Sequence, residues 1–281
     1  MVLRSTRLVS RRVKALLRQI DDWGAEHAAA GVLRDGEIVA THGPHDIALR
    51  WASVTKLATA LATLIAAEEG ILDLDEPAGP EGSTVRHLLA HASGLPFEGE
   101  APIAKPGRRR IYSNTGFERL AEHLAHAAEM PFADYLRAAV FAPLGANAEL
   151  VGSAAAGVHG SLDDLLLLAQ ELQQPMLVAA ETFAEATSVQ FPGLGGVLPG
   201  FGRWDPNDWG LGFELRDEKE PHWTGRRNSP RTFGHFGGSG TFLWVDPAAD
   251  LACTLLTDRE FDDWALDAWP KLSDDVLGEW A

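Results

Sequence analysis

The sequence contains a single cysteine, Cys253, among its 281 residues. One cysteine cannot form an intrachain disulfide, which fits a reducing compartment, and we expect a cytoplasmic protein. Long apolar runs are also missing, because no stretch approaches the roughly 20 residues that a membrane-spanning helix needs. The first twenty residues lack the apolar run of a secretory signal. We therefore expect no integral membrane segment.

Basic residues are scarce. The chain carries 24 lysines and arginines against 40 aspartates and glutamates, which gives a formal net charge of −16. Nucleic acids are bound by basic surfaces, so this balance argues against a nucleic-acid partner and favours a small-molecule substrate. The oligomeric state is left open.

The basic residues that are present gather at the N-terminus, where residues 1–18 hold six of them and no acid. Apolar residues recur there at helical spacing, namely Val9, Val13, Leu16, Leu17 and Ile20. Such a helix can lie on a membrane surface or act in targeting. More simply, it packs its apolar stripe on a sheet and leaves Arg7, Arg11 and Arg18 in solvent. We favour the second interpretation, since periodicity alone supports it.

The two ends of the chain have β-like patterns. Residues 30–41 form two apolar arms around an Asp-Gly pair, which is a strong hairpin signal. The runs 210–215, 241–245 and 251–256 are typical of consecutive antiparallel strands. A last helix is expected over 261–281. A sheet built from both ends of the chain is the economical architecture.

The middle of the chain is predicted to be helical. Residues 58–70 are rich in Ala, Leu and Ile and end at a glycine, which predicts a buried helix. Helices joined by Pro/Gly loops are expected from there to about residue 200. The fold class is therefore α+β, one domain with an antiparallel sheet flanked by helices and an inserted all-helical lobe. The predicted boundaries are a single domain over 1–281, a sheet lobe from about 1–72 and 205–281, and a helical lobe from about 73–204.

The segment Ser53-Val-Thr-Lys56 lies where an irregular stretch passes into the predicted helix over 58–70. A serine in the first turn of a helix has an unpaired N–H near the positive end of the helix dipole, and a lysine three residues later lies on the same face. This arrangement suits an activated hydroxyl beside a cation, with the serine N–H free to stabilise an oxyanion. The alternative is a capping Ser53 and a surface Lys56, and chance alone yields about 0.2 such pairs.

A second segment, Tyr112-Ser-Asn114, precedes a helix expected near Thr115. A tyrosine acts as a base only where a nearby cation lowers its pKa, and Lys56 could supply that charge. Asn114 would point to the same side and hydrogen-bond both Lys56 and a substrate carbonyl. A core tyrosine beside an asparagine turn is the alternative. With two tyrosines and four asparagines in the chain, chance gives only about 0.03 Tyr-x-Asn matches.

A third segment, His235-Phe-Gly237-Gly238, precedes the predicted strand over 241–245. Glycines at the start of a strand let a ligand approach the backbone, and a free N–H there can be a second oxyanion donor. His-x-Gly by itself is uninformative, since about one match is expected by chance. Its weight comes from its position after the other two segments.

In this order, the three segments resemble the motifs of the serine β-lactamase and penicillin-binding-protein superfamily, in the branch of class C β-lactamases, related esterases and D-aminopeptidases. The likeness runs from about Gly31 to Leu256 and includes TVRHLLAHASGLP, YSNTGF, WGLGF and FGHFGGSGTFLWVDP. The resemblance implies a β-lactamase/transpeptidase-like fold and an acyl-enzyme mechanism without metal or other cofactor. By position, it implies Ser53 as nucleophile, Lys56 as the lysine of the first motif, Tyr112 as base, Asn114 as the asparagine of the second motif, His235 at the start of the third motif, and Gly237 and Gly238 at the oxyanion site.

The third motif departs from the family pattern. Lactamases of this branch usually carry Lys-Thr-Gly, and the lysine helps to hold the substrate carboxylate, whereas this chain has His235-Phe-Gly237. A neutral imidazole is a weaker carboxylate anchor, and at its ordinary pKa His235 would gain charge only towards pH 6. We therefore predict a carboxylesterase-like serine hydrolase that cleaves ester or amide bonds of small substrates. A β-lactam substrate would need another cation, for which Arg231 is a candidate.

Several alternatives remain beside this prediction. The chain could be a β-lactamase, a D-amino-acid peptidase or amidase, or a non-catalytic binding protein on the same scaffold. His87 and His91 are four apart on a predicted helix and could share a metal, but no third ligand is evident, so we expect a structural role. No Gly-x-Ser-x-Gly elbow occurs, which argues against an α/β-hydrolase. Aromatic residues near the third motif could line the pocket, namely Trp204, Trp209, Trp223 and Phe233.

Overall fold

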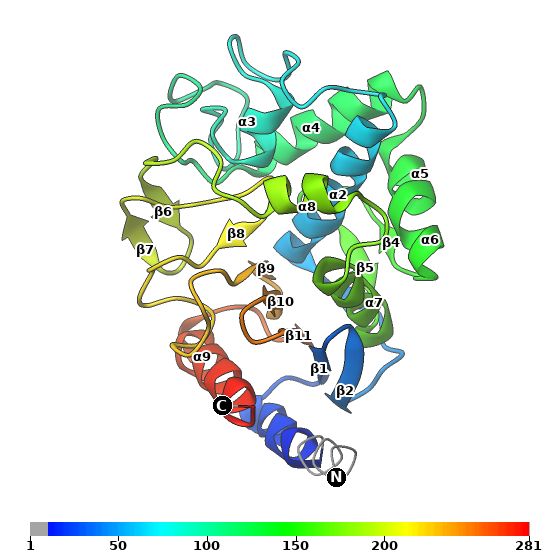
Figure 1. Cartoon of the computed structure of the whole chain (residues 1–281), viewed down its shortest axis with the longest axis vertical. Helices are drawn as coiled ribbons and strands as arrows, with labels where there is room; N and C mark the ends of the chain where they lie inside the picture. The colour runs from blue at the N-terminus through cyan, green and yellow to red at the C-terminus, as the bar shows by residue number, and fades with distance from the viewer. Residues whose placement is uncertain (1–10, 281) are drawn as a thin grey trace.

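Both ends of the chain contribute to one six-stranded antiparallel sheet of order β2-β1-β11-β10-β9-β8, in a computed structural model that describes residues 11–280 (Figure 1). β1 pairs with β11 along its whole length, from Ala28 opposite Thr257 to Arg34 opposite Leu251. This confirms the predicted fold class and the hairpin at the N-terminal end. The strands are β1 (Ala28–Arg34), β2 (Glu37–His42), β8 (Glu214–Leu215), β9 (Phe233–Gly237), β10 (Thr241–Asp246) and β11 (Leu251–Thr257).

Helices cover both faces of the sheet, so its central strands are apolar on both sides. Along β10, Phe242 and Trp244 belong to the core under helix α9 (Asp263–Gly278). Leu243 and Val245, which alternate with them, belong to a larger core on the other face. That face is covered by α7 (Leu162–Gln173), which contacts β1, β10 and β11. α7 thus packs on the sheet, although the predicted boundaries assigned its residues to the helical lobe.

The N-terminal segment is helical over residues 11–17 and continues into the 3-10 helix η1 (Arg18–Trp23). Its side chains Val13, Leu17 and Ile20 are buried in the same core as α9, while Arg11 and Arg18 are exposed. The packed amphipathic helix is therefore confirmed for the described part, and Arg7 and Val9 lie outside the described residues. None of the helices within residues 11–280 combines the length and apolarity needed to cross a membrane.

The middle of the chain surrounds one central helix, α2 (Thr55–Glu68), which is buried on nearly all sides from Thr55 to Ala66. It begins three residues earlier than the sequence predicted and follows the 3-10 helix η2 (Ala52–Val54). Around it lie α3 (Val85–Leu89), α4 (Asn114–Ala127), α5 (Phe132–Leu136), the π-helical turn η3 (Arg137–Phe141), α6 (Ala142–Leu144) and α8 (Ala180–Ala186).

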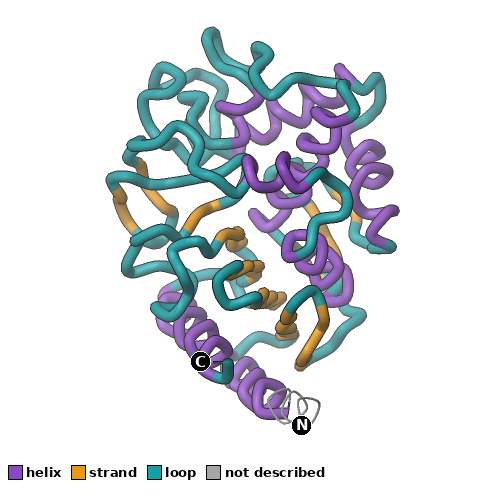
Figure 2. The backbone as a smooth tube through the Cα atoms, viewed as in Figure 1, coloured by secondary structure: helices purple, strands orange, loops and turns teal. Residues whose placement is uncertain are grey.

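The predicted helical middle also contains strands of two small sheets. One sheet joins β5 (Val158–Gly160) and β4 (Glu149–Leu150) to β3 (Leu49–Arg50), which precedes the helical region, and the other is the hairpin β6 (Gly196–Leu198) and β7 (Gly202–Trp204). Figure 2 shows that loops rather than helices make up most of the region around this hairpin. These pieces are too short to give a periodic signal in the sequence.

The predicted strand over 210–215 is wrong for most of its length, because only Glu214 and Leu215 are in strand β8. The backbone before them turns against α2, with Gly212 in the left-handed region at φ 86°. A Cβ at Gly212 would stand 2.3 Å from the Cβ of Ala60. The glycine therefore serves a close helix–loop contact and not a strand.

Candidate active site

Ser53 lies in η2, directly before α2, and its backbone is fixed from both sides. The N–H of the preceding Trp51 donates to the carbonyl of Val158 at 2.8 Å. Ala52 is in the left-handed region at φ 45°, which is unusual for a residue with a side chain and typical of a functional turn. Strand β9 approaches so closely that a Cβ on Gly237 would stand 2.3 Å from the carbonyl oxygen of Trp51.

The Lys56 side chain is fully buried on the first turn of α2. Its Nζ lies 2.7 Å from Asn114 Oδ1, 2.9 Å from the carbonyl oxygen of Ala155 and 3.2 Å from Ser53 Oγ. Burial lowers the pKa of Lys56 well below its ordinary value, although the charge of Glu118 opposes that shift. The amine form of Lys56 is thus far more accessible near neutral pH than that of an exposed lysine.

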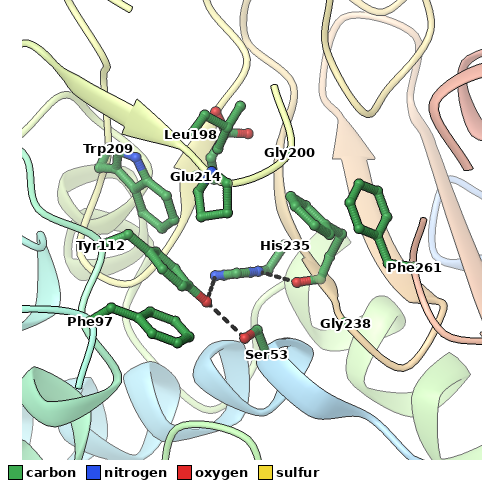
Figure 3. Close-up of a pocket in the computed structure, with 12 residues that line it drawn as sticks. Ser53, Phe97, Tyr112, Leu198, Gly200, Trp209, Glu214, His235, Gly238 and Phe261 are labelled. Atoms are coloured by element: carbon green, nitrogen blue, oxygen red, sulfur yellow. Dashed lines mark hydrogen bonds between the residues drawn. The ribbon is translucent and has the colours of Figure 1, made fainter. Parts of the chain in front are cut away.

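Tyr112 reaches Ser53 from the loop before α4. Its hydroxyl donates to Ser53 Oγ at 2.7 Å and lies 3.4 Å from Nε2 of His235, as Figure 3 shows. Burial of this hydroxyl raises the pKa of Tyr112 above its ordinary value, and the hydrogen bond to Ser53 offsets only part of that. The sequence predicted the opposite direction, a pKa lowered by Lys56. The difference arises because the enclosed site penalises the phenolate more than its surroundings stabilise it.

The loop that carries Tyr112 is held by a buried arginine, Arg110. Its guanidinium donates to backbone carbonyl oxygens of three separate segments, at Ala90, Gln190 and Asn207, over 2.6, 2.6 and 3.0 Å. Three anchors of this kind fix the loop on the helical region. Tyr112 is therefore presented to Ser53 by a backbone with little freedom.

Asn114 is the first residue of α4, and the hydroxyl of Ser113 caps that helix by accepting the N–H of Gly116 at 2.8 Å. The cap fixes the direction in which Asn114 leaves the backbone. Its Oδ1 accepts a hydrogen bond from Lys56. The predicted pairing of Asn114 with Lys56 is therefore present.

The third segment forms the end of β9. His235 is buried, and its Nδ1 lies 2.6 Å from the carbonyl oxygen of Phe236, so the proton belongs on Nδ1 and Nε2 faces the pocket as an acceptor. Burial first, and then the charge of Lys56, lower the pKa of His235 to about 3. The expectation that His235 gains charge near pH 6 is therefore wrong. Gly238 lies at the pocket, and within residues 11–280 neither its N–H nor that of Ser53 donates a hydrogen bond.

These residues open into a cavity of about 260 Å³ that is mainly apolar. Figure 3 shows Trp209, Tyr112 and Phe97 one above another along one side, Ser53 below them and Phe261 on the opposite side. The lining is Ser53, Phe97, Tyr112, Leu198, Pro199, Gly200, Trp209, Glu214, His235, Phe236, Gly238 and Phe261. Trp209 is the one member of the predicted aromatic group that lines it. Arg231 lines a different cavity beside Val189 and Pro230.

Two acidic residues of this region were missed from the sequence. Glu118 accepts the hydroxyl of Ser153 and the N–H groups of Ala154 and Ala155, at 3.2 and 3.3 Å for the latter two. It thereby positions the Ala155 carbonyl that holds Lys56. Glu118 lies four residues after Asn114, on the same face of α4, and this spacing was the available signal.

The other missed acid, Glu214, is buried at the end of the pocket. Its carboxylate pairs with Lys219 at 2.6 Å and His222 at 2.9 Å, and it accepts Trp223 Nε1 at 3.0 Å. Burial raises the pKa of Glu214, but the ion pairs with His222 and Lys219 outweigh it and lower the pKa to about 2. No motif identifies this residue, because its partners come from an irregular loop.

His91, one of the two histidines considered as metal ligands, packs behind Tyr112. Its Nδ1 accepts the N–H of Ser113 at 3.1 Å, and its ring centroid lies 4.6 Å from that of Tyr112. His87 instead bonds the hydroxyl of Thr84 at the start of α3. Within residues 11–280, no three His, Cys, Asp or Glu side chains gather as a metal site would require.

Four of the seven predicted site residues thus line one cavity, namely Ser53, Tyr112, His235 and Gly238. Lys56, Asn114 and Gly237 lie behind Ser53 without lining it. Their roles in catalysis stay predictions. Comparison with known proteins shows the family. A family model described as Beta-lactamase matches residues 13–275. A crystal structure of a beta-lactamase from Mycobacterium bovis is 52% identical, with a TM-score of 0.93 over 94% of this chain and 99% of that one.

More distant proteins match as well. EstCE1, described as a hydrolase with promiscuous acyltransferase activity, has the same fold at a TM-score of 0.80 and 18% identity, covering 97% of this chain and 99% of its own. Penicillin-binding protein 4* of Bacillus subtilis is 32% identical over an alignment that covers 34% of this chain. That match spans only 29% of the Bacillus protein.

Proposed function

The chain is a serine hydrolase of the beta-lactamase family, and within that family we propose that it hydrolyses carboxylic esters of small, mainly apolar substrates through an acyl-enzyme on Ser53. One observation carries the proposal above all. The cavity beside Ser53 is mainly apolar, and within residues 11–280 no lysine or arginine lines it. Lys56 lies behind Ser53, buried with its Nζ engaged by Asn114 and Ala155.

The pKa directions suggest how Ser53 is activated. A neutral Lys56 amine has two N–H donors and one lone pair. The donors fit Asn114 Oδ1 and the Ala155 carbonyl, which leaves the lone pair facing Ser53 Oγ at 3.2 Å. Ser53 then accepts from the Tyr112 hydroxyl and donates to Lys56. On this chain of hydrogen bonds, Lys56 takes the Ser53 proton as Oγ attacks the ester carbonyl.

The negative charge that develops on the carbonyl oxygen is placed near the N–H groups of Ser53 and Gly238. Both donors are fixed, Ser53 by η2 and Gly238 by the end of β9. Donors held in place before the reaction stabilise an oxyanion without further rearrangement. No metal ion is needed for this role.

Collapse of the tetrahedral intermediate breaks the ester C–O bond. The Tyr112 hydroxyl protonates the departing alkoxide, and the Lys56 ammonium returns a proton to Tyr112, so the alcohol carries away the proton that Ser53 lost. A water molecule then attacks the acyl-enzyme and the proton transfers run in reverse, restoring the Ser53 hydroxyl and releasing the acid. His235 Nε2, 3.4 Å from the Tyr112 oxygen, is placed to orient this hydroxyl.

The site disfavours substrates with a carboxylate close to the scissile bond. His235 is neutral and turns a lone pair to the cavity, and the Glu214 carboxylate lies at its end. Desolvating an anion there without a cationic partner is costly. The carboxylate of a β-lactam lies on the ring next to the reacting amide and would meet this environment.

β-Lactam hydrolysis is the second candidate, because the Mycobacterium bovis protein that is 52% identical bears the name beta-lactamase. The decisive comparison is kcat/KM for an aryl acetate against nitrocefin, with Ser53→Ala as the blank. We expect the ester value to exceed the nitrocefin value, and His235→Lys to move the balance towards nitrocefin. A nitrocefin value equal to or above that of the ester would refute the esterase assignment.

The covalent step is tested separately. Intact mass spectrometry after treatment with a fluorophosphonate should show one adduct, located on the Ser53 peptide. Labelling that persists in Ser53→Ala would place the nucleophile elsewhere. No adduct and no ester turnover would instead support the non-catalytic alternative.

A further inference from the structure

A second cavity, of about 510 Å³, adjoins the one at Ser53. The two share Phe97, Tyr112 and Pro199 as lining residues, so they are separated by side chains and not by a layer of backbone. The second cavity extends along the segment 109–112 towards the hairpin β6–β7. A substrate in the Ser53 pocket that extends past these side chains would enter it.

The walls of this groove are apolar and unusually exposed. Phe97, Ile103 and Val197 are 50%, 64% and 53% exposed. Three large apolar side chains in one groove exceed the scattered single residues that are normal on a surface. They suit the apolar part of an extended substrate.

Three arginines line the groove, and the guanidinium of one of them, Arg110, is buried against backbone carbonyl oxygens. The other two are Arg109 and Arg203. They come from separate segments, the Tyr112 loop and strand β7. Both are exposed, and within residues 11–280 neither forms an ion pair. The chain as a whole has 40 acidic side chains against 24 basic ones. Two exposed arginines in one groove, neither of them paired with an acid in the described structure, favour an anion there over the rest of this acidic protein.

We propose that this groove is a substrate subsite that binds an anionic group, a carboxylate, at the far end of an apolar chain whose ester lies at Ser53. The inference rests on the proposed esterase function and adds the substrate class, ω-carboxylated esters. It differs from β-lactam recognition because the charge is held beyond Phe97 and Pro199 and not beside the reacting carbonyl. Arginine matches a carboxylate with two parallel donors.

The test compares two ester series of increasing chain length, one with the terminal group on the acyl side and one with it on the alcohol side. Each ester is measured with a terminal carboxylate and with a terminal primary amide of nearly equal size. The proteins are wild type, the double variant Arg109→Gln/Arg203→Gln, and the control Arg108→Gln. Arg108 is exposed and adjacent in sequence but does not line the groove.

In wild type, the ratio of kcat/KM for carboxylate over amide should peak at one chain length in one series. The double variant should lower that ratio about three- to tenfold, because each exposed ion pair contributes at most about fivefold. Amide-ended esters should keep their turnover, and Arg108→Gln should behave as wild type. Higher salt should reduce the wild-type ratio.

An unchanged ratio in the double variant, or an equal loss in Arg108→Gln, would overturn the subsite. Binding of suberanilic acid and of its neutral terminal amide to Ser53→Ala protein, by calorimetry, tests it without turnover. The acid should bind Ser53→Ala more tightly than the amide does, and this preference should disappear in Ser53→Ala/Arg109→Gln/Arg203→Gln. That result would support the subsite even if no ester is cleaved. In that case the esterase function fails and the anion site stands.

Discussion

Gly237 offers a direct test of the oxyanion site. It ends β9 beside the backbone of Ser53, and a Cβ there would stand 2.3 Å from the carbonyl oxygen of Trp51 and 3.1 Å from the Ser53 nitrogen. Its neighbour Gly238 has no atom within 4 Å of the corresponding position. Gly237→Ala and Gly238→Ala therefore form a matched pair, since both keep every backbone N–H.

The expected magnitude for Gly237→Ala follows from that contact. A Cβ essentially never comes closer than 3.0 Å to such an atom, so the 2.3 Å contact forces β9 to retreat by about 0.7 Å. The Gly238 N–H moves with the strand, away from the position of the substrate's carbonyl oxygen. Displacement of one oxyanion donor costs about 10²–10³-fold in kcat, and a misplacement of about 1 Å costs a similar factor. Gly238→Ala should stay within about threefold of wild type.

The assay is kcat and KM for an aryl acetate, with thermal unfolding as the control for folding. We expect Gly237→Ala to lose mainly kcat and to keep most of its stability, because the clash is local to η2 and the end of β9. The rate of fluorophosphonate labelling should fall in parallel. Wild-type kcat in a folded Gly237→Ala protein, or an equal loss in Gly238→Ala, would refute this account of the oxyanion site.

Three further predictions follow from the buried polar groups. Tyr112→Phe should lose about 10²–10⁴-fold in kcat with little change in melting temperature, and wild-type turnover would leave Lys56 as the sole proton carrier. Glu118→Gln removes the charge that raises the pKa of Lys56, so the acidic limb of the pH–kcat/KM profile should move to lower pH. Glu122→Gln, one turn further along α4, is its control, and an unmoved limb would contradict the role of Glu118. Glu214→Gln leaves the buried Lys219 ammonium without its anion and should destabilise the fold by about 3–5 kcal/mol in thermal or urea unfolding. Because the pKa of Glu214 is lowered to about 2, its contribution to the free energy of unfolding is present above its ordinary pKa and is lost as the pH falls towards 2. An unchanged melting temperature in Glu214→Gln would refute this contribution.

The elements that could be predicted from the sequence are those with local signals. The Asp-Gly hairpin, the alternating strands 241–245 and 251–256, and the alanine-rich helix that became α2 each carry their pattern within a few residues. The site residues Ser53 and Lys56 are one helical turn apart, so their proximity follows from the helix itself. The likeness to the family added the pairing of this turn with the other two segments.

What the sequence did not reveal depends on contacts between distant segments. The strand expected at 210–215 fails because Gly212 packs on Ala60 of α2, a contact across more than 150 positions. Glu118 acts on Lys56 through the backbone of Ala155. Phe97 enters the pocket from an irregular loop with no periodicity. Propensities and motifs contain no information on such pairings.

The charge states of the site residues also depend on contacts between segments that are distant in the sequence. Enclosure by β9, α4 and the Tyr112 loop lowers the pKa of Lys56 and raises that of Tyr112. An amine and a phenol on either side of Ser53 can exchange its proton, whereas an exposed lysine would remain an ammonium. The same burial keeps His235 neutral, so the activation of Ser53 and the absence of a carboxylate anchor beside it have one physical cause. The proposed anion subsite is consistent with this, because it lies in the solvent-exposed, arginine-lined groove beyond Phe97 and not beside the neutral His235.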